Sequence, residues 1–215
     1  MKVIGLDPSL TNFGWALHDT EVPVGNKARC IDRGRFHTSS KTEFLERYMT
    51  LRAEILKLVT DLGVKRVGVE FPIFNDLFSE GMYGLFLFTC EALKIAKVDV
   101  VFFANNQTKA LVRRLLDRPK GWKMCKLDMI EMAKVDAGGG RWSHDEADAY
   151  WVARLAARFW ELHDGVITED DLSLLERQQF TRIHTFKRGK RQGQTVKKGI
   201  LYREDERFFR WSGEE

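Results

Sequence analysis

Four acidic side chains in this chain have types and positions that could bind metal ions. Asp7 and Glu70 each end an apolar run, and Asp145 and Asp148 stand one helical turn apart after the glycine-rich segment 137–140. Carboxylate oxygens are the ligands that magnesium prefers in proteins. Four that converge can hold two ions about 3.5–4 Å apart, which activates a water and stabilises the leaving oxygen in a phosphoryl displacement. The sequence therefore predicts two-metal hydrolysis of a phosphate ester, if the fold brings the four together.

The last two carboxylates are expected at the start of a helix. Ser143 and Glu146 form a capping-box pattern, which predicts a helix that begins at His144. One face of this helix carries residues at steps of three and four: Asp145, Asp148, Val152, Leu155 and Phe159. The two acids should therefore head the apolar stripe that faces a sheet.

Each acid also has an ordinary structural explanation. Asp145 would offset the helix dipole, worth about 0.3–1 kcal/mol, and acids at strand ends such as Asp7 and Glu70 often start turns. Asp148 is harder to explain in this way, because it lies on the buried stripe one turn from a like charge. Burial there without a partner would cost several kcal/mol, and a cation between the acids removes the conflict.

Two basic segments accompany the carboxylates, although the net charge is only +4. Segment 109–126 contains one acid and these bases: Lys109, Arg113, Arg114, Arg118, Lys120, Lys123 and Lys126. Segment 181–203 contains no acid and these bases: Arg182, Lys187, Arg188, Lys190, Arg191, Lys197, Lys198 and Arg203. Either could be a solvated surface, but together, beside a carboxylate site, they favour nucleic acid as the partner.

Composition restricts the class of protein. The 215 residues are 44% hydrophobic, and no apolar run reaches the roughly 18 residues of a membrane helix. The N-terminus has no signal-peptide pattern, so we expect a soluble cytoplasmic protein with no membrane partner. Cys30, Cys90 and Cys125 are expected to be reduced core thiols, and the histidines show no zinc spacing. Any metal should be Mg²⁺, with Mn²⁺ able to substitute.

Hydrophobic periodicity predicts alternating strands and helices. Ser40 and Thr42 are candidate caps of the first helix. The expected elements are strands 2–6, 13–17 and 29–36, helix 44–62, strand 66–70, helix 82–96, strand 98–103, helices 108–116 and 126–134, and helix 144–163. This order predicts an α/β fold, a mixed five-stranded sheet with helices on both faces. We expect residues 1–164 to form this domain and residues 165–215 a basic extension, part of it a hairpin docked on the domain.

Three motifs resemble those of the RuvC-type Holliday junction resolvases, which have the ribonuclease H-like fold. They are the segment 4–14 around Asp7, the pair Val69-Glu70, and the segment 144–149 with its D-x-x-D-A pattern. The resemblance covers about residues 1–160. It departs from the family at Ser9, where glycine is usual, and in the basic extension, which is more typical of a phage or divergent member.

The resemblance implies a magnesium-dependent homodimer that nicks four-way DNA junctions symmetrically, leaving a 5′-phosphate and a 3′-hydroxyl. It implies Asp7, Glu70, Asp145 and Asp148 as metal ligands, with His144 as a substitute for Asp145. It implies DNA contacts by Lys109 and Lys126 and junction probing by Phe74. Basic residues that we add as expected DNA contacts are Arg113, Arg188, Lys190 and Arg191.

Several other functions fit parts of the pattern. Sugar kinases and actin-like phosphotransferases also open with a strand, an aspartate and a glycine-containing hairpin, but this chain is short for their two domains. A ribonuclease H acting on RNA-DNA hybrids would use the same carboxylates. A protein that binds branched DNA without cutting it would not need them all. The unusually apolar helix 82–96 is expected at the centre of the dimer interface.

Overall fold

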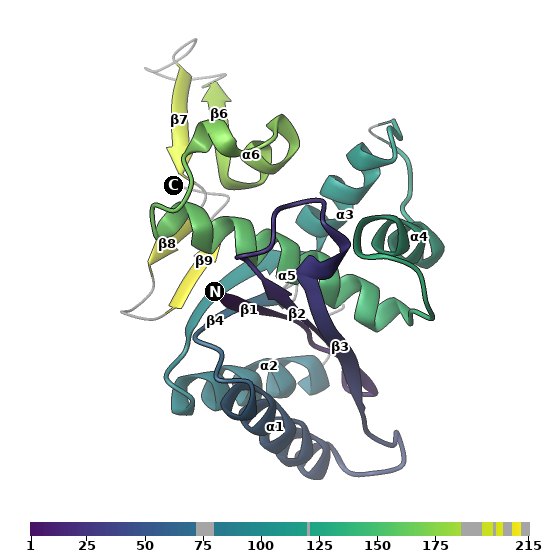
Figure 1. The fold of residues 1–215 in the computed structure, drawn as a ribbon. Helices are drawn as coiled ribbons and strands as arrows, with labels where there is room; N and C mark the ends of the chain where they lie inside the picture. The colour runs from purple at the N-terminus through teal and green to yellow at the C-terminus, as the bar shows by residue number, and fades with distance from the viewer. Residues whose placement is uncertain (72–79, 120, 186–194, 200, 204–207, 212–215) are drawn as a thin grey trace.

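The computed structural model describes residues 1–71, 80–119, 121–185, 195–199, 201–203 and 208–211. Its centre is a sheet with the strand order β3-β2-β1-β4-β5-β9-β8 (Figure 1). Strands β1 (Lys2–Asp7), β2 (Asn12–Asp19) and β3 (Cys30–His37) form an antiparallel meander. Strands β4 (Arg66–Phe71) and β5 (Asp99–Ala104) continue from β1 in parallel. The predicted mixed five-stranded sheet is confirmed.

Helices cover both faces of this sheet, as predicted (Figure 1). Helices α1 (Phe44–Asp61) and α2 (Glu80–Ile95) pack on one face. Helix α5 (His144–His163) lies along the other face, accompanied by α3 (Asn105–Leu115) and α4 (Lys126–Ala137). Side chains alternate along each strand, so even positions of β1 face α1 and odd positions face α5. The sheet therefore separates two hydrophobic cores.

Two details of the predicted elements are wrong. Neither Ser40 nor Thr42 caps α1: its N-cap is Glu43, whose side chain makes no capping hydrogen bond. The cysteines are free thiols, but Cys125 is exposed at the start of α4 and the other two are only half-buried, so they are not core residues. In α2, Leu85 and Leu93 are buried under the sheet, whereas Tyr83, Leu87 and Ile95 are about half exposed.

The chain beyond α5 adds elements that periodicity did not predict. A 3₁₀ turn η2 (Glu169–Asp171) precedes α6 (Leu174–Phe180), whose start carries the capping-box pair Ser173 and Glu176. Strand β6 (Thr181–Thr185) pairs antiparallel with β7 (Thr195–Gly199). Strand β8 (Leu201–Arg203) pairs antiparallel with β9 (Phe208–Trp211), which lies parallel to β5. The division into 1–164 and 165–215 stays a prediction.

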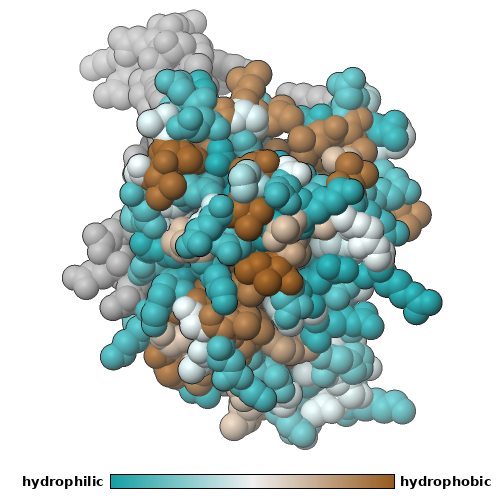
Figure 2. Space-filling model, viewed as in Figure 1, coloured by the Kyte–Doolittle hydropathy of each residue, from teal (hydrophilic) through white to brown (hydrophobic). Residues whose placement is uncertain are grey.

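A buried ion network joins α5 to the segments around it. Arg29, in the 3₁₀ turn η1 (Lys27–Arg29), donates to Glu161 at 2.6 Å, and Arg158 donates to the same carboxylate at 2.7 Å. Arg158 also donates to the carbonyl of Asp171. All three charged side chains are buried. Figure 2 shows hydrophobic residues in separate patches on one face. Among the described residues, no helix combines the length and apolarity needed to cross a membrane.

Candidate active site

Asp7 and Glu70 point to the same face of the sheet, the face covered by α5. Leu6 and Val69 are paired in the parallel register of β1 and β4, so Asp7 and Glu70 occupy the next matching positions. The glycines two residues earlier, Gly5 and Gly68, lie directly against the backbone or side chains of α5. Because side chains alternate along a strand, the two acids share the face of those glycines. The predicted strand ends therefore place both carboxylates toward α5.

Glycines allow α5 to lie unusually close to the sheet. A Cβ atom at Gly5 would lie 2.6 Å from the Cα of Ala153, and one at Gly68 would lie 2.5 Å from the Cβ of Ala156. A Cβ at Gly14, on β2, would lie 2.6 Å from the carbonyl carbon of Asp145. Such distances are well below ordinary contact, so any side chain at these positions would push the helix away. Gly14 in particular sets the height of the carboxylate end of α5.

The start of α5 is fixed as the sequence predicted. The Ser143 hydroxyl accepts from the Glu146 backbone N–H at 3.2 Å, and the Ser143 backbone N–H donates to the Glu146 carboxylate at 2.7 Å. This capping box begins the helix at His144. Asp145 follows in the first turn with only 6% of its surface exposed, and Asp148 lies one turn later.

Electrostatics show that the four carboxylates face one another. The pKa of Asp7 is raised well above its ordinary value, chiefly by burial, and then by the charges of Glu70, Asp148 and Asp145. The pKa of Asp148 is also raised, again chiefly by burial. Lys109, on α3, acts in the opposite direction on both acids. The fold therefore brings Asp7, Glu70, Asp145, Asp148 and Lys109 into one region.

The donor set fits a hard divalent cation. Oxygen Oδ1 of Asp148 is buried and has no hydrogen-bond partner within the described residues. A buried carboxylate oxygen without a donor is costly, and a cation would satisfy it. Within the described residues, no three His, Cys, Asp or Glu side chains already converge as metal ligands. Mutual repulsion of four carboxylates accounts for this spacing, and a cation would have to draw them together.

The other candidate residues have different placements. Lys126 begins α4, and its Nζ lies 2.7 Å from Nε2 of His144. Arg113 lies one turn after Lys109 on α3, and its Nε is buried with no hydrogen-bond partner in the described part of the chain. Phe74 and the basic residues Arg188, Lys190 and Arg191 lie outside the described residues.

Sequence reasoning missed two features of this region. The contact between Lys126 and His144 joins residues 18 positions apart, and no local pattern indicates it. Gln107 was also missed: it accepts from the backbone N–H of Ala104 at 2.7 Å and donates to the carbonyl of Gln179 at 3.2 Å, which ties the start of α3 to α6. Its position three residues after Ala104 was the one available signal.

Comparisons with known proteins agree with the predicted resemblance. Over 75 residues, 35% of this chain, it is 33% identical to the crossover junction endodeoxyribonuclease RuvC of Ehrlichia ruminantium (strain Welgevonden) and 32% identical to that of Halothermothrix orenii. These residues span 47% and 44% of the two relatives, so the chain matches less than half of their length. No family model matches the chain.

Solved structures extend the likeness to most of the chain. The RuvC structure of Thermus thermophilus covers 77% of this chain and 97% of its own, with a TM-score of 0.59 and 22% identity. T. thermophilus RuvC in complex with Holliday junction substrate covers the same shares, with a TM-score of 0.57 and 20% identity. The chain therefore has the RuvC fold, and its resemblance to RuvC-type resolvases, predicted from the motifs, is confirmed.

Proposed function

We propose that this chain is a metal-dependent endonuclease that cuts four-way DNA junctions and other branched DNA. The proposal is carried by the group of four carboxylates from β1, β4 and α5. The unpartnered buried oxygen of Asp148 supports it, because that oxygen needs a cation. The fold of RuvC, one structure of which is a complex with Holliday junction substrate, supports the choice of DNA junctions.

The reaction follows from the chemistry of these residues. Asp7, Glu70, Asp145 and Asp148 would hold two Mg²⁺ ions, which when bound activate a water and stabilise the leaving oxygen. Water attacks the phosphorus, the P–O3′ bond breaks, and the products carry a 5′-phosphate and a 3′-hydroxyl. Lys109 places a positive charge beside Asp7 and Asp148, where it can also contact the scissile phosphate.

Basic residues around the site would bind the DNA backbone. Lys126 is exposed at the start of α4, on the same side of the sheet as the carboxylates. Arg113 follows Lys109 by one helical turn. We assign further phosphate contacts to Arg188, Lys190 and Arg191, and insertion at the junction centre to Phe74.

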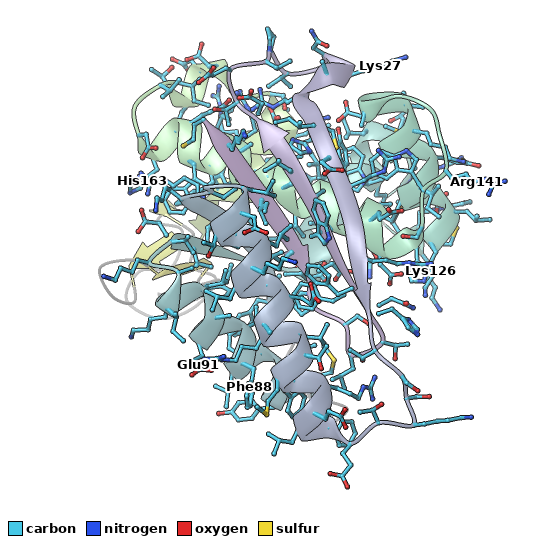
Figure 3. The ribbon with its side chains drawn as sticks, turned by 60° about the horizontal axis from the view of Figure 1, so that its bottom comes forward. Lys27, Phe88, Glu91, Lys126, Arg141 and His163 are labelled. Atoms are coloured by element: carbon cyan, nitrogen blue, oxygen red, sulfur yellow. The ribbon has the colours of Figure 1, made fainter. Side chains whose placement is uncertain are left out.

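A homodimer would present two sites to a symmetric junction. Apolar side chains that are about half exposed lie on α1 and α2, which pack side by side: Phe44, Leu45, Met49, Tyr83 and Leu87. Figure 3 shows α1 in front, with Phe88 and Glu91 of α2 beside it. Apolar side chains exposed together are typical of an interface. We propose that this α1–α2 surface joins two copies of the chain.

Cleavage of labelled DNA tests the function. The full chain is incubated with Mg²⁺ or Mn²⁺ and a four-way junction, a flap, a linear duplex or an RNA-DNA hybrid. We expect metal-dependent, paired nicks in the junction, and loss of cleavage but retained junction binding in Asp148→Asn. Preferential cutting of the hybrid would instead identify a ribonuclease H. Junction binding without cleavage in any metal would identify a binding protein and overturn the proposal.

Oligomeric state tests the dimer separately. We expect light scattering at micromolar concentration to give twice the mass of one chain for the wild type and a single-chain mass for Leu87→Glu. Val135→Glu is the matched control, because Val135 is exposed on α4 across the sheet from α2. A wild-type monomer, with or without DNA, would remove the dimer from the proposal.

A further inference from the structure

His144 stands between a candidate DNA-binding lysine and a candidate metal ligand. Its Nε2 lies 2.7 Å from Nζ of Lys126, and its Nδ1 lies 3.0 Å from Oδ1 of Asp145. Lys126 begins α4 and His144 begins α5, so the contact joins the first residues of two helices. Capping boxes fix both helix starts, which limits how far the two ends can move apart.

The donors and acceptors along this chain of contacts are complementary. An ionised carboxylate only accepts hydrogen bonds, so Nδ1 of His144 must donate to Asp145. An ammonium group only donates, so Nε2 must accept from Lys126. One neutral tautomer of the ring, with its proton on Nδ1, satisfies both contacts. Lys126 keeps two further protons for phosphate oxygens, and Asp145 keeps Oδ2 outside this contact.

We infer that His144 is a positioning residue, which orients the Asp145 carboxylate for the metal and holds Lys126 beside it. This inference rests on the proposed function. Ligand carboxylates that are fixed by a hydrogen-bond donor are pre-organised for the ion, and loss of such a donor typically weakens metal binding about 10–100-fold. His144 does not itself bind the metal in this assignment, because both ring nitrogens are engaged.

The same helix supplies a matched control. At the far end of α5, Nδ1 of His163 lies 2.9 Å from Oδ1 of Asp164, again a contact between sequence neighbours. The exposed fractions of the two histidine side chains are also similar, 38% for His163 and 33% for His144. Asp164 pairs with Arg66 and lies away from the carboxylate group, and Figure 3 places His163 and Lys126 on opposite sides of the molecule.

Binding of Mn²⁺ to the full chain, measured by calorimetry without DNA, tests the inference. We expect His144→Ala to weaken Mn²⁺ binding about 10–100-fold, and His163→Ala to leave it unchanged. His144→Asn should recover most of the affinity, because its amide can donate to Asp145 from the position of Nδ1. Affinity within twofold of wild type for His144→Ala, or no recovery in His144→Asn, would overturn the positioning role.

Two further readings separate the possible failures. Electron spin echo spectra of the wild-type Mn²⁺ complex should show no directly bound nitrogen; a bound nitrogen would make His144 a ligand and refute the inference. Asp148→Asn should lose Mn²⁺ binding. If it binds Mn²⁺ as well as the wild type does, the proposed metal site itself fails, whereas loss in Asp148→Asn without loss in His144→Ala refutes only the role of His144.

Discussion

Gly14→Ala should impair cleavage much more than it impairs folding. The added Cβ would lie 2.6 Å from the carbonyl carbon of Asp145, whereas carbon atoms normally meet at about 3.5 Å or more. The first turn of α5 must therefore retreat by about 1 Å from β2. This turn carries Asp145, and Asp148 follows it, whereas Asp7 and Glu70 stay with the sheet. The substitution should thus separate the two halves of the carboxylate group.

The expected magnitudes differ for the two properties. Overpacking of this kind costs about 1–3 kcal/mol of stability, and each kcal/mol lowers Tm by about 2–4 °C in a chain of this size. A misplacement of about 1 Å in a catalytic group can lower the rate about 100-fold. Single-turnover cleavage at saturating enzyme and thermal unfolding, measured on one preparation, give both values.

The control is Gly139→Ala, which adds the same methyl group where nothing lies within 4 Å. It should change neither the cleavage rate nor Tm measurably. A cleavage rate within threefold of wild type for Gly14→Ala would show that α5 does not hold the carboxylates at a critical height. That result would refute the argument from close backbone packing.

Three further predictions concern charge. Asp7→Asn should raise Tm in EDTA at pH 7: its raised pKa makes the ionised form of Asp7 destabilise the fold as pH rises through that pKa, so the gain should vanish below about pH 4 in calorimetry, and a lower Tm at pH 7 would contradict it. Arg29→Ala strips a buried partner from Glu161 and should cost about 3–5 kcal/mol in urea unfolding, whereas Arg52→Ala, from a more exposed pair, should cost under about 1 kcal/mol; equal losses would refute the distinction. Neutralising the three basic residues of segment 188–191 should reduce the slope of log affinity against log salt for junction DNA by up to about 0.9 per phosphate contact, and an unchanged slope would remove that segment from the interface.

Most of the fold was predictable because it depends on local periodicity. The buried stripe Tyr48, Leu51, Ile55 and Val59 defines α1, and apolar runs define the five strands of the predicted sheet. Helix α6 was missed because it is only 7 residues long and too short for periodicity to indicate. Its Ser173-x-x-Glu176 pattern is nevertheless the same capping signal that located α5.

The candidate site was predictable only in part, for a related reason. Each acid could be assigned to an element from its neighbours in sequence, since Asp7 and Glu70 end strands and Asp145 and Asp148 share a helix face. The partners of those acids are not local. Contacts such as that of His144 with Lys126 depend on how two helices are placed in space, and a single sequence contains no periodic signal for it.

The packing of α5 on glycines explains how the fold tolerates the carboxylate group at all. Burial and like charges both raise the pKa of Asp7, so its ionised form works against folding. The helix that brings two of these charges also carries Ala149, Ala153 and Ala156, whose backbone or methyl groups meet Gly5 or Gly68. Small residues on both sides allow close contact over the length of the helix, and this dispersion and apolar burial oppose the repulsion at its first turns. The glycines of β1, β2 and β4 therefore stabilise the helix and position its acids through the same contacts.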